Sequence, residues 1–254
     1  MPIIFIDRSN SPYLQWSLAQ AADSNPTSMI YLLGVEANNR YDFVEHYRAA
    51  DFSQEAGEFN KAYAHRSSLS RPSELWRFQR WFILKEFMER ANLKSCLYLA
   101  AETLLYCDVT DDVRRFSHVD FALPGITTNN LMYLGESTAL QEFCQFLRKV
   151  HTRRDQFHYN EMVAHYANHR RHRLNGGVND MVAFRMFAHH VRDNVRVLDV
   201  SEIIEGSAYD HDIASPRPAV EMEVAPKRKY HQRAGVAGGN PLRTSNQDRR
   251  RGPV

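Results

Sequence analysis

The sequence has few cysteines and lacks the short motifs that mark several large enzyme classes. Its 254 residues include three cysteines, Cys96, Cys107 and Cys144, too few and too scattered for a disulfide framework or a cysteine zinc site. No GxSxG, P-loop, GxGxxG or CxxC pattern occurs. Serine-hydrolase, P-loop and nicotinamide-cofactor functions therefore have no motif support. The cysteines are expected to act as small apolar residues in a reducing compartment.

Long apolar runs are also absent. The opening MPIIFIDRSN has no basic start and a single four-residue apolar run, which argues against a signal peptide. No stretch approaches the roughly 18 apolar residues of a membrane span. A soluble, cytoplasmic protein with no transmembrane segment is expected.

Charge is spread unevenly along the chain. The formal net charge is +2, but residues 215–254 hold nine Lys/Arg and three Asp/Glu, so residues 1–214 hold 23 basic and 27 acidic residues. The last forty residues also contain five prolines and four glycines and have no apolar periodicity. We therefore predict a folded domain over 1–214 and a disordered basic tail over 215–254.

Strand-like and helical segments alternate, which is typical of an α/β domain. PIIFID (2–7) and MIYLLG (29–34) predict buried strands, separated by a helix that Ser11 caps and Pro12 begins. This βαβ unit starts a parallel sheet with a right-handed crossover. CLYL (96–99) predicts the next strand, and a late strand is predicted over 195–200.

Four further helices are predicted. One is capped by Ser73 and has a broad apolar face that includes Lys85, and the others cover 137–150, 152–173 and 181–191. The polar and aromatic stretch 40–72 predicts short helices and loop. NGGVNDM (175–181) predicts a loop, because paired glycines weaken both helix and strand.

Histidines recur every seven residues in one polar segment, at positions 151, 158, 165 and 172. On one continuous helix His165, His169 and His172 share a face, as a zinc site requires. The segment has no HExxH pattern, so the favoured interpretation is a basic helix face that contacts an acidic partner. The tail motifs KRK (227–229) and RRR (249–251) allow contact with nucleic acid through charge. Nucleic-acid binding is not expected, since the body contains no recognisable binding module.

Polar segments follow predicted strands at three places where ligands bind in open α/β sheets: DRSNS (7–11), AAE (100–102) and NGGVND (175–180). A lone Glu after a buried strand is often a surface turn residue. Against that, phosphate–metal chemistry needs hard oxygen ligands at a strand end, and short neighbours let a diphosphate approach.

Several stretches together resemble a bacterial group of GT-A-type nucleotide-sugar glycosyltransferase-like proteins. They occur in the matching order over residues 2–213: NSPYLQWSLAQA, MIYLLG, YAHRSS, ELWRFQRWFILKEFM, YLAAETLLY, NGGVNDM and AYDHDI. The resemblance implies a GT-A-like, Rossmannoid fold, in which helices flank a mixed, mostly parallel sheet.

The resemblance places a metal-binding DxD element after the strand at 96–99. Its carboxylates would hold Mn²⁺ or Mg²⁺ against the diphosphate of the donor. In this chain the slots are Ala100, Ala101 and Glu102, so Glu102 is the remaining candidate ligand and a weakened metal dependence is expected. The C-terminal His-Gly element of the group is replaced by the tail, with EMEV (221–224) as its last remnant.

Other residues also receive roles from the resemblance. Asp180 corresponds to the catalytic acidic position near the acceptor and the transferred sugar. Six residues correspond to donor-binding positions: Asp7, Arg8, Asn10, His65, Ser67 and Arg80. Arg80 could instead pair with Glu74 or with a helix end.

The resemblance thus implies a glycosyltransferase that moves a sugar from a nucleotide-diphosphate donor to a carbohydrate or lipid acceptor, with weakened activity or metal dependence. The first alternative is a catalytically degenerate protein of the same fold that acts as a binding module. The second is a nucleic-acid-associated protein that acts through its basic tail.

Overall fold

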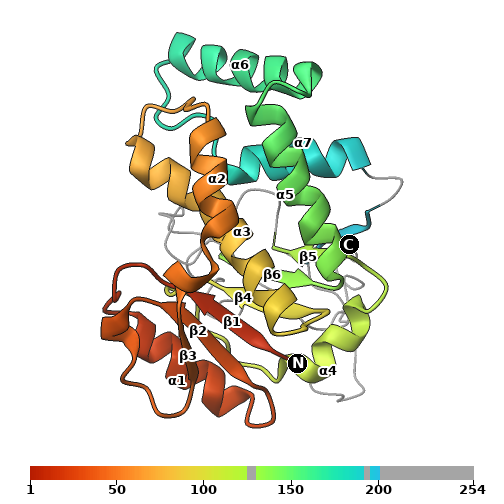
Figure 1. Cartoon of the computed structure of the whole chain (residues 1–254). Coiled ribbons are helices and arrows are strands. Elements are labelled where there is room, and N and C mark those ends of the chain that lie inside the picture. Colours follow the sequence, from red (N-terminus) through yellow and green to blue (C-terminus); the bar gives the residue numbers. More distant parts are fainter. Residues whose placement is uncertain (125–129, 192–194, 201–254) are drawn as a thin grey trace, which may run out of the picture.

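A seven-stranded sheet organises the protein (Figure 1). The computed structural model describes residues 1–124, 130–191 and 195–200. The strand order across the sheet is β3-β2-β1-β4-β6-β5-β7. The strands are β1 (Ile3–Ile6), β2 (Ile30–Gly34), β3 (Glu45–Arg48), β4 (Cys96–Leu99), β5 (Phe121–Leu123), β6 (Leu131–Leu134) and β7 (Val197–Asp199).

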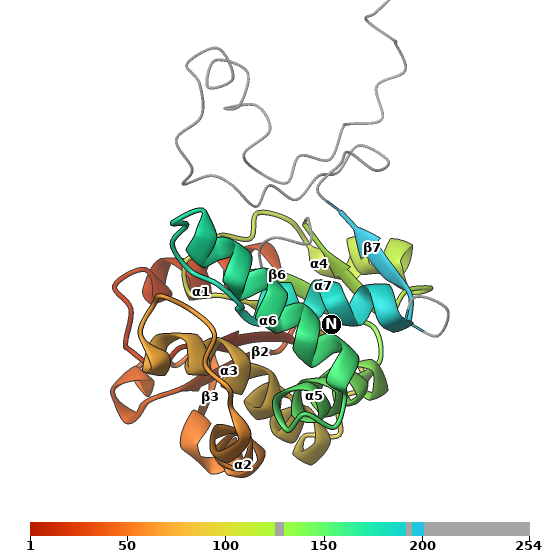
Figure 2. The same ribbon diagram turned by 90° about the horizontal axis from the view of Figure 1, so that it is seen from above.

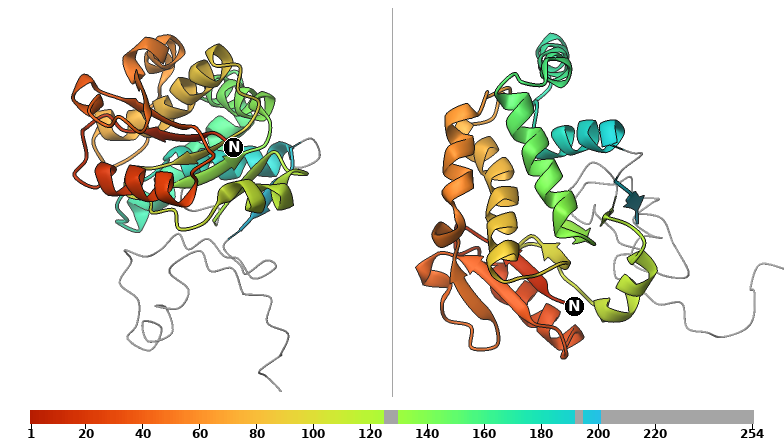
Figure 3. Two further views of the ribbon diagram at one scale, coloured as in Figure 1. Left: turned by 90° about the horizontal axis from the view of Figure 1, so that it is seen from below. Right: turned by 45° about the vertical axis from the view of Figure 1, so that its right-hand side comes forward.

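Helices cover both faces of this sheet, as the left view of Figure 3 shows for α1 against α2 and α3. On one face of the sheet, a first hydrophobic core includes side chains of α2, α3, α5 and α7. On the opposite face, a second core includes side chains of α1 and α4. α6 lies at the outer end of α5, away from the sheet (Figures 1 and 2). The helices are α1 (Leu14–Ser24), α2 (Gln54–Ala62), α3 (Arg71–Arg90), α4 (Val109–Val113), α5 (Ser137–His151), α6 (Gln156–Arg171) and α7 (Asp180–Val191).

The sheet is mixed and mostly parallel, as expected. β1 pairs in parallel with both β2 and β4, β2 with β3, and β5 with β7. β6 runs antiparallel to β4 and to β5. After β1 the chain adds β2 on one side of that strand, and later it adds β4 on the other side. The strand order therefore changes direction at β1 and β4.

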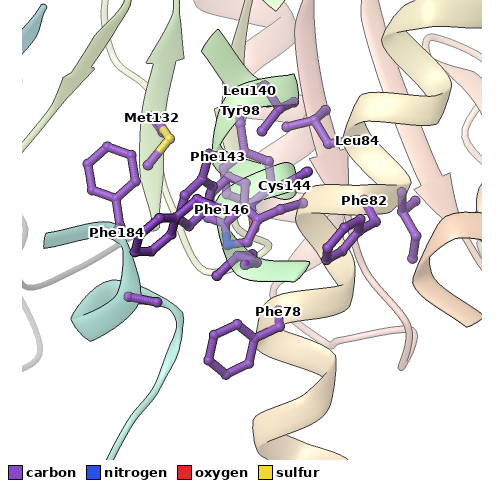
Figure 4. Packing of buried hydrophobic residues seen from close by; sticks show 14 of the residues in the cluster. Phe78, Phe82, Leu84, Tyr98, Met132, Leu140, Phe143, Cys144, Phe146 and Phe184 are labelled. Atoms are coloured by element: carbon purple, nitrogen blue, oxygen red, sulfur yellow. The ribbon is translucent and has the colours of Figure 1, made fainter. Parts of the chain in front are cut away.

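Two cores form because successive strand residues point to opposite faces. Ile4 and Ile6 of β1 join the core beneath α3 and α5, whereas Ile3 and Phe5 join the core beneath α1. Aromatic side chains fill much of the first core, and Figure 4 shows the layer formed by Phe78, Phe82, Tyr98, Phe143 and Phe184. Each such side chain contributes about 1.5–3 kcal/mol when it is buried.

Two predicted helix starts were wrong. α1 begins at Leu14 with Tyr13 at the N-cap position, so Ser11 and Pro12 precede the helix, although the Ser11 hydroxyl accepts a hydrogen bond from the Tyr13 backbone N–H (3.3 Å). α3 begins at Arg71, and its N-cap is Ser70, whose hydroxyl accepts a hydrogen bond from the Ser73 backbone N–H (3.4 Å). Ser70 and Ser73 are both suitable caps, so local sequence did not determine which of them caps α3.

Three strands were missed. β3 is an edge strand in the polar stretch 40–72, and its exposed side chains show no apolar alternation. β5 and β6 are buried apolar runs of three and four residues, no shorter than the predicted strands β7 and β4, and the polar residues, Pro124 and Gly125 around them concealed the apolar pattern. The predicted strands at β1, β2, β4 and β7 were confirmed, as were α5, α6 and α7.

Lys85 lies on the apolar face of α3 because its charge is compensated there. Its ammonium contacts the carboxylates of Glu55 (2.7 Å) and Glu89 (2.9 Å), and Arg148 of α5 also contacts Glu55 (2.7 Å). The network ties α2, α3 and α5 together. Burial raises the pKa of the thiols of Cys96 and Cys144, consistent with the expected apolar role. The predicted boundary at 214–215, the tail and EMEV lie outside the described residues.

Candidate functional site

The carboxyl ends of β1 and β4 form the edge where the candidate residues gather. These two strands are parallel neighbours, so the loops that follow them open toward the same edge of the sheet. The strand order changes direction at β1 and β4, and in open α/β sheets ligands commonly bind at such a point. The three polar segments predicted from the sequence follow β1, follow β4 and precede α7.

The loop after β1 is organised by Asp7. This residue is 6% exposed, and its carboxylate accepts hydrogen bonds from the backbone N–H (3.1 Å) and hydroxyl (3.0 Å) of Ser9 and from the Ser11 N–H. Asn10 adopts a left-handed backbone (φ 50°), and its side-chain oxygen accepts from the buried Asn38 (3.2 Å). Asp7 and Asn10 therefore shape the loop.

The turn after β4 presents one carboxylate. Ala100 and Ala101 are buried, so they do not provide the open space that short residues were expected to leave, and Glu102 is exposed. The Ala100 N–H donates to the carbonyl of Asn130 (2.7 Å), and the Ser17 hydroxyl of α1 donates to the carbonyl of Ala101. These contacts hold the turn that carries Glu102.

The predicted Gly-Gly loop delivers Asp180 to this edge. Gly176 (φ 87°) and Gly177 (φ 157°) both have positive φ, and a Cβ on Gly177 would overlap the backbone of Arg66 and Ser67. The close approach lets Ser67 bridge to Gly177, while the Val178 N–H donates to the carbonyl of Arg66 (2.7 Å). α7 then begins at Asp180.

Arg80 and Asp180 form a buried ion pair that joins α3 to α7. Arg80 Nη2 lies 2.7 Å from Asp180 Oδ2, and the two side chains are 11% and 1% exposed. Trp81 Nε1 donates to the same carboxylate oxygen (2.9 Å), and Arg80 Nη1 donates to the Tyr98 hydroxyl (3.1 Å). Arg80 thus pairs with Asp180, while Glu74 lies 3.8 Å from Arg77.

Electrostatics connects this pair with Glu102. Burial alone would lower the pKa of Arg80, but Tyr98, Asp180 and Glu102 outweigh it and the pKa is raised. Burial also raises the pKa of the Tyr98 phenol, against the opposing charge of Arg80. The guanidinium therefore stays charged at an edge that carries two carboxylates.

A second polar group lies along α3 near Asp180. Burial raises the pKa of the Glu74 carboxyl; Arg77 opposes this shift, Asp180 adds to it and His65 opposes it. His65 also contacts the Tyr63 hydroxyl through Nδ1 (3.2 Å). Sequence reasoning missed Glu74 as a buried group, and it missed Trp81 and Tyr98, because nothing in an apolar helix or strand pattern indicates a hydrogen-bonding role.

The six donor-binding candidates do not all meet. Arg80 reaches the edge itself, and Asp7 and Asn10 shape the loop beside it. Ser67 is buried and supports the Gly-Gly loop, while Arg8 is exposed and its guanidinium lies over the Trp76 ring, 5.2 Å from the centroid.

Comparisons with known proteins show the fold. No protein-family model and no curated protein matches the chain. Mouse xyloside xylosyltransferase 1 superposes with a TM-score of 0.54 over 79% of this chain and 86% of that one, at 10% sequence identity. The fold is that of the GT-A glycosyltransferases. A mutant of LgtC (TM-score 0.45, 12% identity, 91% and 84% covered) and GlyE of Streptococcus pneumoniae TIGR4 (0.43, 13%, 78% and 44%) also match.

The described part of this GT-A fold does not assemble a metal site. Within residues 1–124, 130–191 and 195–200, no three His, Cys, Asp or Glu side chains are grouped to hold a metal ion. The Asp7 carboxylate is buried and accepts from Ser9 and Ser11, and that of Asp180 is buried and accepts from Arg80 and Trp81, whereas Glu102 is exposed. The possible histidine site was not found there either. No helix in these ranges is long and apolar enough to cross a membrane.

Proposed function

We propose that the protein binds a nucleotide-diphosphate sugar at the carboxyl ends of β1 and β4 and transfers the sugar to a carbohydrate or lipid acceptor. The buried Arg80–Asp180 pair carries this proposal. Burying two charges is costly, and functional sites are where proteins commonly retain such groups. The pair lies within electrostatic reach of Glu102, at the edge where open α/β sheets bind ligands.

The proposal assigns separate roles to the residues at this edge. The loop from Asp7 to Asn10 contacts the nucleotide, and Arg80 supplies positive charge near the departing diphosphate. Asp180 lies on the acceptor side and orients Arg80. Its side chain is 1% exposed, and its carboxylate already accepts hydrogen bonds from Arg80 and Trp81. Glu102 remains the candidate ligand for Mn²⁺ or Mg²⁺, with a weak dependence of binding on the metal.

Thermal unfolding with nucleotide sugars tests donor binding. A ligand at 100 times its Kd adds about 2.7 kcal/mol to the free energy of unfolding, so UDP- or GDP-sugars should raise the Tm. Mn²⁺ should add a small further increase that Glu102→Gln removes. Glu142→Gln, an exposed carboxylate change on α5, is the matched control and should leave the increase intact. If no nucleotide sugar moves the Tm, donor binding is refuted.

A non-catalytic binding module is the second candidate. The observation in its favour is that Asp7 and Asp180 are both buried and already hydrogen-bonded, which leaves little acidic chemistry at the edge. Release of nucleoside diphosphate in the presence of candidate acceptors separates the two functions. Binding of a nucleotide sugar without release, across sugar and lipid acceptors, would support the binding module and contradict transfer.

A further inference from the structure

A cavity lies between α6 and α7, two helices that are close together in Figures 1 and 2. Its volume is about 670 Å³, in the range of small-molecule binding sites. α7 turns Asp180 toward α3 and Phe184 toward the core, whereas the α7 residues that line the cavity begin at Arg185, which is exposed. The residues assigned to the edge at β1 and β4 are not among those that line it, so the cavity is a separate site.

One end of the cavity is held in place by contacts within the protein. Asp155 is the N-cap of α6, and its carboxylate accepts a hydrogen bond from the His158 backbone N–H (3.1 Å) and contacts the ring Nδ1 (2.7 Å). His158 is 4% exposed, and its ring packs edge-on against the ring of His190 of α7, with the centroids 4.6 Å apart. Both rings line the cavity, so this end is ordered before a ligand arrives, which lowers the cost of binding.

The two helices contribute opposite charges to the lining. Glu161 projects from α6, and its carboxylate lies 3.8 Å from Nε2 of His158, beyond hydrogen-bond distance. Arg185 projects from α7 and forms no ion pair or side-chain hydrogen bond with the residues that the structure describes. The cavity therefore offers an acceptor on one wall and a donor on the other, and the two charges balance.

This lining selects for the chemistry of the ligand. An anion would be repelled by Glu161 and a cation by Arg185, and a hydrocarbon would leave both groups and the imidazoles without partners. A neutral ligand with several hydroxyl groups satisfies both walls, because a hydroxyl donates and accepts. The ring of Phe157, which is 69% exposed, adds a flat apolar surface to the lining. Sugar rings combine these features, with hydroxyl groups around the edge and apolar C–H groups on the faces.

We propose that this cavity binds a neutral oligosaccharide, with hydroxyl groups between Glu161 and Arg185 and one ring face on Phe157. The hydroxyl groups form charge-assisted hydrogen bonds with the two side chains, and the C–H face covers apolar surface of the aromatic ring. The site depends neither on donor binding nor on sugar transfer, because it lies on the other side of α7 from Asp180. It stands even if the protein binds no nucleotide sugar.

Three linear trisaccharides serve as probes: cellotriose, maltotriose and chitotriose. Saturation-transfer difference NMR measures their binding to the full chain, and at least one should bind with a Kd below about 10 mM. Because the ligand carries no charge, its Kd should change less than about twofold between low and high salt. Neither UDP nor sodium sulfate in excess should displace the sugar.

Two alanines of α6 offer a matched pair of variants. Ala164 lines the cavity and Ala167 does not, and both are exposed. Ala164→Phe should weaken the trisaccharide at least about tenfold by occupying the cavity, whereas Ala167→Phe should leave the affinity unchanged. The two substitutions have the same cost in helix propensity, so a difference between them reports the cavity.

Charged side chains provide the second comparison. Arg185→Gln and Glu161→Gln should each weaken the trisaccharide about fivefold, the value of one hydrogen bond. Arg171→Gln, which changes an exposed arginine of α6 outside the cavity, should have no effect. The proposal is overturned if none of the trisaccharides binds, or if Ala164→Phe binds the sugar as well as Ala167→Phe does. Displacement by sulfate would also overturn it by showing an anion site, and displacement by UDP would place the sugar at the nucleotide edge.

Discussion

Replacing Asp180 by Asn should destabilise the protein strongly. The substitution keeps the shape of the side chain and an oxygen that can accept from Trp81, but it removes the charge opposite Arg80. Arginine does not lose its proton in proteins, so the guanidinium, 11% exposed, stays charged. Breaking a buried pair by removing one partner costs about 3–5 kcal/mol. That is a large part of a typical stability of about 5–15 kcal/mol.

Urea unfolding followed by circular dichroism measures this cost, and a double-mutant cycle isolates the pair. Arg80→Met alone should also be costly, but the double variant should recover about 2 kcal/mol or more relative to the sum of the single effects. Arg48 and Asp51 form the control pair. Their separation is 2.8 Å, close to the 2.7 Å of Arg80 and Asp180, but they are 59% and 47% exposed, so solvent screening should make their coupling much smaller than that of the buried pair.

Salt gives a second readout of the same argument. A buried pair is screened little, so the coupling between Arg80 and Asp180 should hardly change when salt is added, whereas the control coupling should fall. The reasoning is refuted if Asp180→Asn costs less than about 1 kcal/mol, or if both couplings are equally small. In that case the pair would not explain why α7 docks where it does.

Two pH-dependent predictions follow from other buried groups. Burial raises the pKa of Glu74, and its Oε2 has no hydrogen-bond partner among the described residues, so Glu74→Gln should raise the Tm at neutral pH. This gain in Tm should shrink toward pH 4.5, where the native carboxyl is protonated, and a gain that does not depend on pH would contradict the prediction. Burial, aided by Arg66, lowers the pKa of His151 to about 3. In the unfolded chain His151 is protonated near pH 6.5, whereas in the folded protein it stays neutral. The free energy of unfolding therefore falls by about 1.4 kcal/mol for each pH unit below 6.5. His151→Phe should flatten the pH dependence of the urea midpoint below pH 6.5, and an unchanged slope would exclude His151 as its source.

Much of the central sheet was predictable because its strands are buried on both faces. The apolar runs at β1, β2 and β4 needed no knowledge of their neighbours, and the expected βαβ unit is present. β3 was not predictable in this way, since an edge strand with exposed side chains has no apolar signature. The antiparallel direction of β6 depends on how a short buried run pairs with β4 and β5, which local sequence does not record.

The same distinction between local and tertiary information applies to the candidate site. By itself the sequence determined which loops carry polar residues, and it indicated that Gly176 and Gly177 form a loop, because backbone conformation is a local property. Tertiary structure alone decided that Arg80 meets Asp180, one hundred residues later, and that Ala100 and Ala101 are covered while Glu102 is exposed. Periodicity reports which face of an element is buried. The partner of a buried charge depends on which loops the sheet brings to one edge.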